Sequence, residues 1–469
     1  MQSTQYSSFW FKEALENEPD LRPRKLETDT TTDVCIVGGG FTGLWTAIQL
    51  KMKQPSLDIL VIEKDLCGSG ASGRNGGCML TWSTKYLTLK KLYGEAEAIR
   101  LVKASEAAVY DIEAFCKAHG IEAQIRLDGT LYTASNRAQI GAMDPVLAAL
   151  DKQSINAWQP WTKEKVQSES GSDVHLEGHF SSAAGTVQPG LLVRGLKRVA
   201  EEMGVTIFEH TPMTAIDRQQ TPVRIATPGG NIRADKVVLA LNAWMPSLFP
   251  EFKHSVVLVS SDMLITEPAP EHLKNLGLRD GKSVIDGRTF VHYYRTTPDG
   301  RLMLGKGGNY FSFGNKVSTV FDQPSRYQAI LRAAFRRFFP AMQSVPLAMT
   351  WTGASDRSAT GMPFFGRLAD NPSVVYGLGY SGNGVVQSWM GGQILSSLVL
   401  EEDNDWARSG LVSGPKGAFP PEPIRWLGAI LVRNAIRRKE SAEDENQTPN
   451  WLDTQLSRFA QSAGKADKS

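Results

Sequence analysis

The sequence predicts an α/β fold in which a parallel sheet carries a phosphate-binding turn and is joined to a second unit built mainly on an antiparallel sheet. An apolar run at residues 34–37 breaks into glycines and then into a helical pattern, which predicts a buried parallel strand. A second apolar run, at 58–62, ends in the acidic residue Glu63, as the next strand of such a sheet does. Short strand-like segments separated by turns between residues 255 and 310 predict the antiparallel unit.

The glycines after the first predicted strand have the spacing G-x-G-x-x-G, at Gly38, Gly40 and Gly43. Gly38 permits a tight turn, Gly40 lets a pyrophosphate approach the backbone, and Gly43 lets the following helix lie close to the strand. The unpaired N–H groups and the positive end of that helix bind the pyrophosphate. Glu63 follows Gly43 by 20 residues, where a carboxylate accepts hydrogen bonds from a ribose. Strand, turn, helix, second strand and acid together predict dinucleotide binding.

Length and composition indicate a protein of several domains and argue against several classes of binding function. A chain of 469 residues is too long for one ordinary core, so two or three domains are expected. Lys+Arg 51 against Asp+Glu 49 gives a net charge of +2, which offers no electrostatic basis for nucleic-acid binding. The start of the chain does not have the pattern of a signal peptide, and no apolar run approaches about 18 residues, so a cytoplasmic protein without a transmembrane segment is expected. The four cysteines lack C-x-x-C spacing, so neither a metal site nor a disulfide framework is expected.

Two further glycine-rich stretches follow strands. The block at residues 68–77 comes just after the predicted ribose-binding strand, and residues 379–384 separate a strand at 373–379 from a helix that ends near Leu400. Because glycine lets backbone lie directly against a ligand, we predict that the 68–77 block contacts the bound ligand. An ordinary flexible loop is the alternative.

The remaining pattern predicts further elements. Phe9, Trp10 and Phe11 are expected to dock the polar N-terminal segment on the body of the protein, and a hairpin is expected at 125–134, turning on Asp128-Gly129. The chain after about residue 440 is expected to fray. The basic helix at 425–439 is expected to pack on the body, with a role at a membrane surface as the alternative. Other expected strands are 205–209, 223–227, 230–234, 236–241, 256–259, 290–295 and 301–304, and other expected helices are 41–51, 95–119, 189–203 and 324–339.

In their order along the chain, these motifs resemble those of the FAD-dependent amine and D-amino-acid oxidoreductases, the group that includes glycine oxidase and sarcosine oxidase. The resemblance runs from about residue 30 to 400 and rests on the segments 38–43, Glu63, 70–77, 234–240 and 379–384. It is closest to the gamma-glutamylputrescine oxidoreductase branch and to related aminophosphonate oxidoreductases, the latter through residues 292–301 and 355–358.

The resemblance implies a discontinuous, Rossmann-like FAD-binding domain of the glutathione-reductase type and a substrate domain on a mainly antiparallel sheet. We expect the FAD-binding domain at 30–90, 185–245 and 345–400, and the substrate domain at 91–184 and 246–344. An N-terminal docking segment would occupy 1–29, and a C-terminal helical extension with a polar tail would occupy 401–469.

The resemblance also implies which residues hold FAD. Glu63 would hold the adenosine ribose, the 70–77 block the pyrophosphate and ribityl chain, and Met213 the adenine through its backbone. The turn from Gly379 to Val385 would lie at the pyrimidine edge of the flavin, where a helix N-terminus stabilises negative charge. The full set is Gly38, Gly40, Phe41, Thr42, Gly43, Glu63, Lys64, Gly70, Ala71, Ser72, Arg74, Asn75, Gly76, Gly77, Met213, Ala240, Gly353, Gly379, Ser381, Gly382, Asn383, Gly384 and Val385.

A covalent link between FAD and the protein is not expected. Some relatives tether FAD through a cysteine late in the chain or through a histidine beside the early glycine block. No cysteine follows Cys116 here, and the block contains no histidine. FAD is therefore expected to be held by non-covalent contacts alone.

The implied reaction is oxidation of a small amine, with hydride transfer from the α-carbon to flavin N5 and hydrolysis of the resulting imine. Because desolvation lowers the pKa of an ammonium group, no dedicated base is required, and no catalytic residue is assigned. Amino-acid oxidases of this family place an arginine for the substrate carboxylate where this chain has Ser355, and Arg357 stands two residues further on. We therefore expect an amine with its anionic group elsewhere, best an N-methylated 2-aminoethylphosphonate. Candidates for the substrate anion or the flavin face are Arg357, Arg295, Lys306 and Tyr294.

Three alternatives stay open. The substrate could be gamma-glutamylputrescine or another polyamine derivative, or the chain could be a flavin-carrying subunit that only passes electrons. An NAD dehydrogenase fits less well, because the two additional glycine-rich turns suit one longer cofactor. Oxygen and another electron acceptor, such as a membrane quinone, are both compatible with the sequence.

Overall fold

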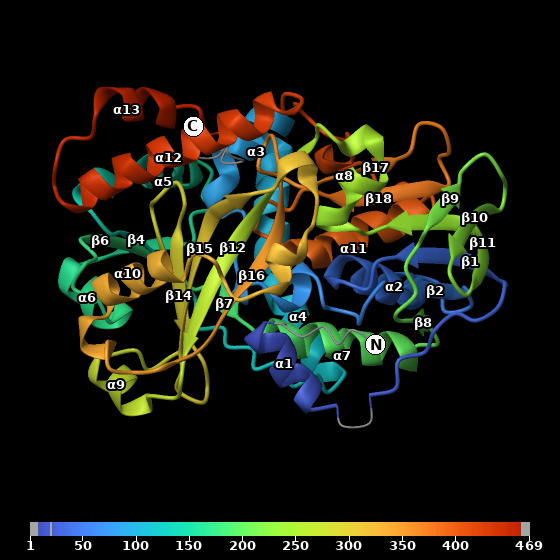
Figure 1. Ribbon diagram of the computed structural model, residues 1–469, viewed down its shortest axis with the longest axis horizontal. Helices are drawn as coiled ribbons and strands as arrows, with labels where there is room; N and C mark the ends of the chain where they lie inside the picture. The colour runs from blue at the N-terminus through green and yellow to red at the C-terminus, as the bar shows by residue number, and fades with distance from the viewer. Residues whose placement is uncertain (1–7, 19–20, 461–469) are drawn as a thin grey trace.

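The computed structural model describes residues 8–18 and 21–460. Two large sheets dominate it, and Figure 1 shows them side by side, the parallel sheet in the right half and the second sheet in the left half. The fold is mixed α/β, as the sequence predicts.

The parallel sheet carries the first glycine-rich turn. Its strands in spatial order are β17 (Phe364–Arg367), β18 (Val374–Leu378), β11 (Gly230–Leu239), β1 (Thr30–Val37), β2 (Ile59–Ile62) and β8 (Thr206–Phe208), with β10 (Val223–Thr227) and β9 (Ala215–Asp217) attached to β11. The strands from β18 to β8 run parallel. Along β1, Val34 and Ile36 face one core while Cys35 and Val37 face another. Burial on both faces explains why this strand is a continuous apolar run in the sequence.

Helices cover one face of the parallel sheet. Residues of α2 (Phe41–Lys53), α4 (Glu95–Ala118), α7 (Pro189–Glu202) and α11 (Val385–Val399) share one hydrophobic core with the strands. The opposite face packs on Met245, Phe249 and Phe252, which follow β11 in the chain.

The second sheet is antiparallel except where β13 pairs with β4. Its strands in spatial order are β16 (Leu347–Ser358), β12 (Val256–Thr266), β15 (Leu302–Phe311), β14 (His292–Thr296), β13 (Ser283–Asp286), β4 (Thr130–Ala134), β6 (Glu177–Ser181) and β5 (Trp158–Trp161). Helix α10 (Gln328–Phe338) packs on it through Leu331, Phe335 and Phe338. A short ribbon of β3 (Cys78–Met79) and β7 (Gly185–Thr186) lies apart from both sheets.

The remaining helices lie around these layers. They are α1 (Phe9–Glu16), α3 (Tyr86–Tyr93), α5 (Asp144–Lys152), α6 (Lys163–Ser170), α8 (Met245–Leu248), α9 (Pro270–Asn275), α12 (Ile424–Asp444) and α13 (Trp451–Ser457). In α1, Trp10 and Phe11 are buried, so the N-terminal aromatics do dock on the body. In Figure 1, α12 and α13 run along the upper left edge of the molecule. Within residues 8–18 and 21–460, no helix is long and apolar enough to cross a membrane.

Four expectations about individual elements are wrong. The hairpin at 125–134 does not form: β4 pairs with β6 and β13, while Arg126 makes an isolated bridge to Thr186. The strands expected at 230–234 and 236–241 are one strand, β11. The chain after residue 440 continues as α12 to Asp444 and adds α13, although residues 461–469 lie outside the described part. Strand β16, assigned by sequence to the nucleotide-binding segments, pairs with β12 in the second sheet. The domain ranges as a whole stay a prediction.

Candidate functional site

The turn between β1 and α2 is built so tightly that side chains are excluded from it. Gly38 has a φ of +115°, and a Cβ there would lie 2.5 Å from the carbonyl oxygen of Ala240. A Cβ on Gly43 would lie 1.9 Å from the carbonyl oxygen of Gly38. Gly40 is the N-cap of α2 and has no side chain with which to cap the helix itself. The N–H groups in the first turn of such a helix are the groups that bind anions.

Glu63 lies directly behind this turn, after the last residue of β2. Its carboxylate accepts hydrogen bonds from the backbone N–H of Gly39 at 2.9 Å and from that of Asp65 at 3.0 Å. Burial raises the pKa of Glu63, and the two backbone N–H groups oppose that shift. A carboxylate has about four acceptor positions, so two remain for a ribose.

The second glycine-rich block wraps around the start of α2. Ser72 Oγ accepts a hydrogen bond from the Phe41 N–H at 2.8 Å, and a Cβ on Gly40 would lie 2.9 Å from the same oxygen. Asn75 holds the block in shape, because its Nδ2 donates to the Ser72 carbonyl at 2.8 Å and its Oδ1 accepts from the Gly77 N–H at 2.8 Å. These contacts bring the first two turns together at one edge of the sheet.

Arg74 is the member of this block whose side chain turns toward the protein. Its guanidinium donates to the carbonyls of Ser69 and Phe321 and pairs with Asp322 at 2.8 Å. Its own carbonyl accepts a hydrogen bond from Trp351 at 2.9 Å. Arg74 therefore braces the block against the second sheet.

The third turn connects β18 to α11. Gly379, Ser381 and Gly382 have φ angles of +88°, +57° and +88°, and Gly384 begins α11 without a side-chain cap in the described chain. Tyr380 links this turn to the first one, because its hydroxyl lies 2.8 Å from Thr42 Oγ1. The two helix N-termini, of α2 and α11, therefore belong to one connected site at the carboxyl ends of parallel strands, where ligands of such sheets bind.

The outer residues of the predicted cofactor set lie around these turns. Ala240 is buried and donates its N–H to the Val37 carbonyl at 2.9 Å, and Met213 packs against the core behind β11. A Cβ on Gly353 would lie 3.5 Å from Cβ of Arg74. The ammonium of Lys64 lies 4.9 Å from the ring centre of Trp244.

Arg295 and Tyr294 are two of the four candidates for the substrate anion or the flavin face. Arg295 is buried, donates to the carbonyls of Gly76 and Val187, and lies 4.6 Å from the ring of Trp10. Tyr294 lies in the core of the second sheet and donates to the Ser170 carbonyl at 2.8 Å. Both side chains are buried and hydrogen-bonded within the protein, and the role expected for each at the substrate or flavin stays a prediction.

Lys306 belongs to a buried polar cluster on the second sheet. Its Nζ donates to the Phe290 carbonyl at 3.0 Å and lies 3.2 Å from His292 Nε2, and His292 Nδ1 lies 2.9 Å from Asp286. Burial lowers the pKa of Lys306 to about 8. Along β15 the neighbouring Gly307 faces Arg357, so the Lys306 side chain points to the opposite face of the sheet. Lys306 and Arg357 thus lie on different faces of the sheet, and the role expected for Lys306 stays a prediction.

Arg357 is the candidate that lies at the third turn. Its Nη1 donates to the Ser381 carbonyl at 3.2 Å. A Cβ on Gly307 would lie 3.1 Å from its Nη2, and a Cβ on Gly382 would lie 3.6 Å from it. Two residues before it, the Oγ of Ser355 is buried and has no hydrogen-bond partner within the described chain. Glycines therefore surround the Arg357 guanidinium near the Ser355 hydroxyl, and this arrangement is suited to binding a polar ligand.

Trp244 and Asn242 are site residues that the sequence reasoning did not single out. A Cβ on Gly70 would lie 3.3 Å from the Trp244 ring, and the buried Oδ1 of Asn242 has no partner among the described residues. Asn242 has a φ of +44° just after β11. An asparagine in that position is a turn signal, and it could have drawn attention to this end of the strand.

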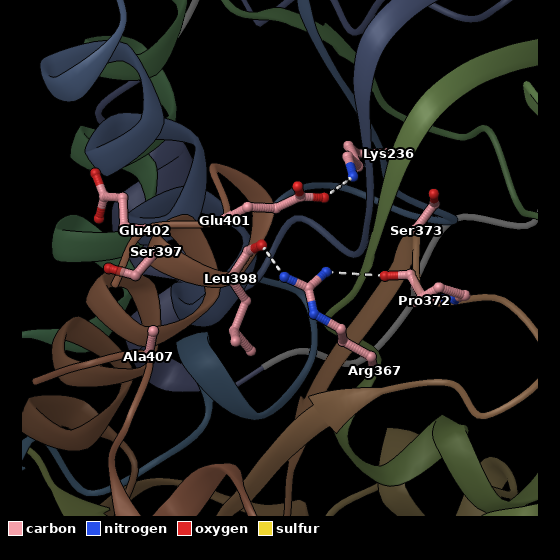
Figure 2. A pocket seen from close by; sticks show the side chains of 9 residues that line it. All are labelled: Lys236, Arg367, Pro372, Ser373, Ser397, Leu398, Glu401, Glu402 and Ala407. Carbon is pink, nitrogen blue, oxygen red and sulfur yellow. Dashed lines mark hydrogen bonds and ion pairs between the residues drawn. The ribbon is translucent and has the colours of Figure 1, made fainter. Parts of the chain in front are cut away.

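A surface pocket of about 420 Å³ lies away from these turns. Figure 2 shows Arg367 donating to the carbonyls of Pro372 and Leu398, and Lys236 paired with Glu401. Ser373 precedes β18 and Leu398 lies in the last turn of α11, so this pocket lies at the opposite end of that strand–helix unit from the third turn. It is therefore not the candidate site.

Fold and site together define a dinucleotide-binding oxidoreductase with two sheets. The family model described as FAD dependent oxidoreductase matches residues 33–398, so the chain belongs to this family. It is therefore an FAD-dependent oxidoreductase.

Individual relatives agree with this assignment. The gamma-glutamylputrescine oxidoreductase of Escherichia coli is 28% identical over 384 residues, which cover 80% of this chain and 85% of the relative. A probable oxidoreductase OrdL of Haemophilus influenzae is 27% identical over 376 residues, covering 79% of this chain and 83% of the relative. The crystal structure of glycine oxidase from Geobacillus kaustophilus superposes with a TM-score of 0.67 at 19% identity, covering 82% of this chain and 99% of that one. This last likeness shows that the fold is shared.

The residues present fit an FAD molecule. FAD is long and carries a pyrophosphate in its middle, and the site offers two helix N-termini that begin at glycine N-caps and are linked through Tyr380 and Thr42. The unpartnered hydroxyl of Ser355 and amide oxygen of Asn242 are buried polar atoms that a polar ligand would satisfy.

Proposed function

We propose that this chain oxidises a small amine whose anionic group lies away from the reacting carbon, best an N-methylated 2-aminoethylphosphonate. The observation that carries the proposal is the place of Arg357 beside the third turn, with the short, neutral Ser355 two residues before it. A guanidinium forms strong, charge-assisted hydrogen bonds with phosphonate or carboxylate oxygens.

In this proposal the three turns hold the cofactor. Gly38 to Gly43 and Ser72 would bind the pyrophosphate, Glu63 the adenosine ribose, and the turn from Gly379 to Val385 the pyrimidine edge of the flavin. When bound, FAD supplies the oxidising chemistry by accepting a hydride from the carbon next to the amine nitrogen. Oxygen or another electron acceptor would then restore it.

The chain's own residues would bind and orient the amine. Arg357 would fix the anionic end, and the Ser355 hydroxyl would donate or accept a further hydrogen bond. Buried surroundings lower the pKa of an ammonium group, which favours the neutral amine from which a hydride can leave. This assigns positioning and desolvation to the protein and leaves it without a dedicated base.

Gamma-glutamylputrescine, or another polyamine derivative, is the second candidate. It is favoured by the 28% identity to the Escherichia coli gamma-glutamylputrescine oxidoreductase over most of both chains. That molecule also carries a carboxylate far from its reacting carbon, so Arg357 would serve either substrate.

The test is anaerobic bleaching of the bound flavin by a panel of amines. The panel contains N-methyl-2-aminoethylphosphonate, 2-aminoethylphosphonate, gamma-glutamylputrescine, glycine, sarcosine and N-methylpropylamine, which has no anionic group. We expect fastest bleaching with the N-methylated phosphonate. Faster bleaching by gamma-glutamylputrescine would favour the second candidate, and bleaching by none of them would contradict amine oxidation by this chain alone.

Arg357→Met tests the anion-binding role. The loss of charge-assisted hydrogen bonds worth about 1.5–3 kcal/mol should raise KM for the phosphonate amine by about ten- to a hundredfold. KM for N-methylpropylamine should stay within about twofold, because that amine lacks the anion. The matched control is Arg408→Met, since Arg408 is exposed and pairs only with surface carboxylates in the described structure. Equal effects on both amines would refute the assignment, provided the variants are compared at equal FAD content.

A further inference from the structure

The turn before α11 is held by three consecutive residues of β16. The Asp356 carboxylate accepts a hydrogen bond from the Gly379 N–H, and its carbonyl accepts one from the Ser381 N–H at 3.0 Å. Arg357 donates to the Ser381 carbonyl, and the Ser358 N–H donates to Ser381 Oγ at 3.0 Å. Two of the turn's residues with positive φ, Gly379 and Ser381, are thus held by hydrogen bonds to a neighbouring strand, in addition to the bond from Ser381 Oγ to the Gly379 carbonyl at 2.9 Å.

Asp356 is the acidic residue among these three residues of β16, and its carboxyl group is buried. It is 1% exposed. The charged and titratable groups whose fields act on it are the neighbouring Arg357 on the same strand and Tyr380 on the turn. An ionised carboxylate beside the Gly379 N–H adds a negative charge to the turn that leads into α11, and this charge opposes the positive field that the helix end exerts on a ligand.

We propose that Asp356 is a positioning residue for the cofactor: its carboxylate holds the turn before α11 in shape, and its charge lowers the reduction potential of the flavin bound there. This inference rests on the proposed position of the flavin at Gly379 to Val385. Two-electron reduction places negative charge on the flavin, so an ionised carboxylate behind the turn disfavours reduction and a neutral side chain favours it.

The protonation state of Asp356 predicts a second observable effect, a pH dependence of the flavin potential. Burial raises the pKa of Asp356 to about 7, while the Gly379 N–H and the guanidinium of Arg357 act in the opposite direction. The carboxyl therefore changes charge in the neutral range. The flavin potential should then be governed by a neutral Asp356 near pH 6 and by an ionised one near pH 8.

The test is a reductive titration of the holoenzyme against a reference dye at pH 6, 7 and 8, with Asp356→Asn and Asp356→Ala compared with the wild type. Asparagine keeps an oxygen that accepts from the Gly379 N–H but carries no charge. At pH 8 we expect Asp356→Asn to raise the ratio of reduced to oxidised flavin at a fixed potential at least tenfold, which equals about 30 mV for two electrons. At pH 6 the difference should fall below threefold.

Affinity for FAD distinguishes the two roles proposed for Asp356, which are to hold the turn in shape by its hydrogen bond and to act on the flavin by its charge. Asp356→Asn should bind FAD within about threefold of the wild type in a fluorescence titration of the apoprotein, whereas Asp356→Ala should bind at least tenfold more weakly. Asp453→Asn is the control, because Asp453 is also a buried carboxylate but lies on α13 of the C-terminal extension, where it pairs with Arg438. It should change neither the potential nor the affinity.

Equal potentials of the wild type and Asp356→Asn at pH 8, or a difference of the same size at pH 6 and pH 8, would overturn the proposal. Asp356→Asn retains the hydrogen-bond acceptor, so the measurement stands even if the alanine variant does not fold. The titration uses a chemical reductant and no amine. A holoenzyme that no amine reduces therefore contradicts the proposed function while leaving the role of Asp356 open to this measurement.

Discussion

Glu63→Gln probes how the acidic residue after β2 supports the first turn. The carboxylate of Glu63 accepts two backbone N–H groups, from Gly39 and Asp65, through different oxygens. Glutamine has nearly the same volume but only one oxygen, so one of the two N–H groups would meet an NH₂ group. An unsatisfied buried N–H costs about 1–3 kcal/mol.

The cost should appear in both cofactor affinity and stability. If this free-energy cost destabilises only the FAD-bound state, the Kd for FAD rises by about 5- to 150-fold. The assay is a titration of apoprotein with FAD, followed by flavin fluorescence, together with urea unfolding of the apoprotein. The unfolding midpoint should decrease only modestly, since β2 remains buried on both faces.

Glu402→Gln serves as the control for this prediction, because Glu402 makes a surface ion pair with Lys53 and should leave the Kd unchanged. An unchanged Kd in Glu63→Gln would refute the assignment of Glu63 to the ribose. A lower unfolding free energy with an unchanged Kd would show that this carboxylate only braces the turn.

Three further predictions concern stability and cofactor attachment. Trp10→Ala should lower the free energy of unfolding by about 3–5 kcal/mol in urea denaturation, because Trp10 is fully buried against Trp351; Leu452→Ala, at an exposed position, should change it little. FAD should be released into the supernatant by acid precipitation. The half-buried Cys78 has a pKa raised to about 11 by burial, which disfavours the thiolate needed for a tether, and flavin fluorescence that stays with the denatured protein would contradict this. Because the folded pKa of Asp356 lies above its ordinary value, its contribution to apoprotein stability is complete below pH 4 and is lost as pH rises to 7, by at most about 1.4 kcal/mol per pH unit. Asp356→Asn should flatten that slope in unfolding midpoints measured from pH 4.5 to 7.5, and an unchanged slope would speak against the shift.

The sequence by itself determined the parts of the site that depend on local geometry. Gly38, Gly40 and Gly43 stand where a strand turns into a helix, and close contacts at each position exclude a Cβ. Such a turn is specified within a few residues, so its spacing can be recognised without knowing what packs around it. The same holds for Glu63 at the end of a short buried strand, and for the start of α11 after residues 379–384.

Only the tertiary structure decided which polar side chains reach this site. Tyr294, Arg295 and Lys306 lie within one predicted antiparallel unit, but strand alternation and packing direct each of them into the protein, where buried carbonyls or ring atoms are their partners. A period of two tells which residues share a face, but it does not tell which face meets the cofactor. That choice depends on pairings between distant segments.

Strand β16 shows the same dependence on distant partners. It pairs with β12 across about ninety residues of chain, and this pairing places Asp356, Arg357 and Ser358 against the turn before α11. The sequence marks Arg357 as a charged residue near a glycine, and it contains no local signal for Asp356. Long-range strand pairing and burial decide the roles of both residues, because they bring together groups that are far apart in the sequence.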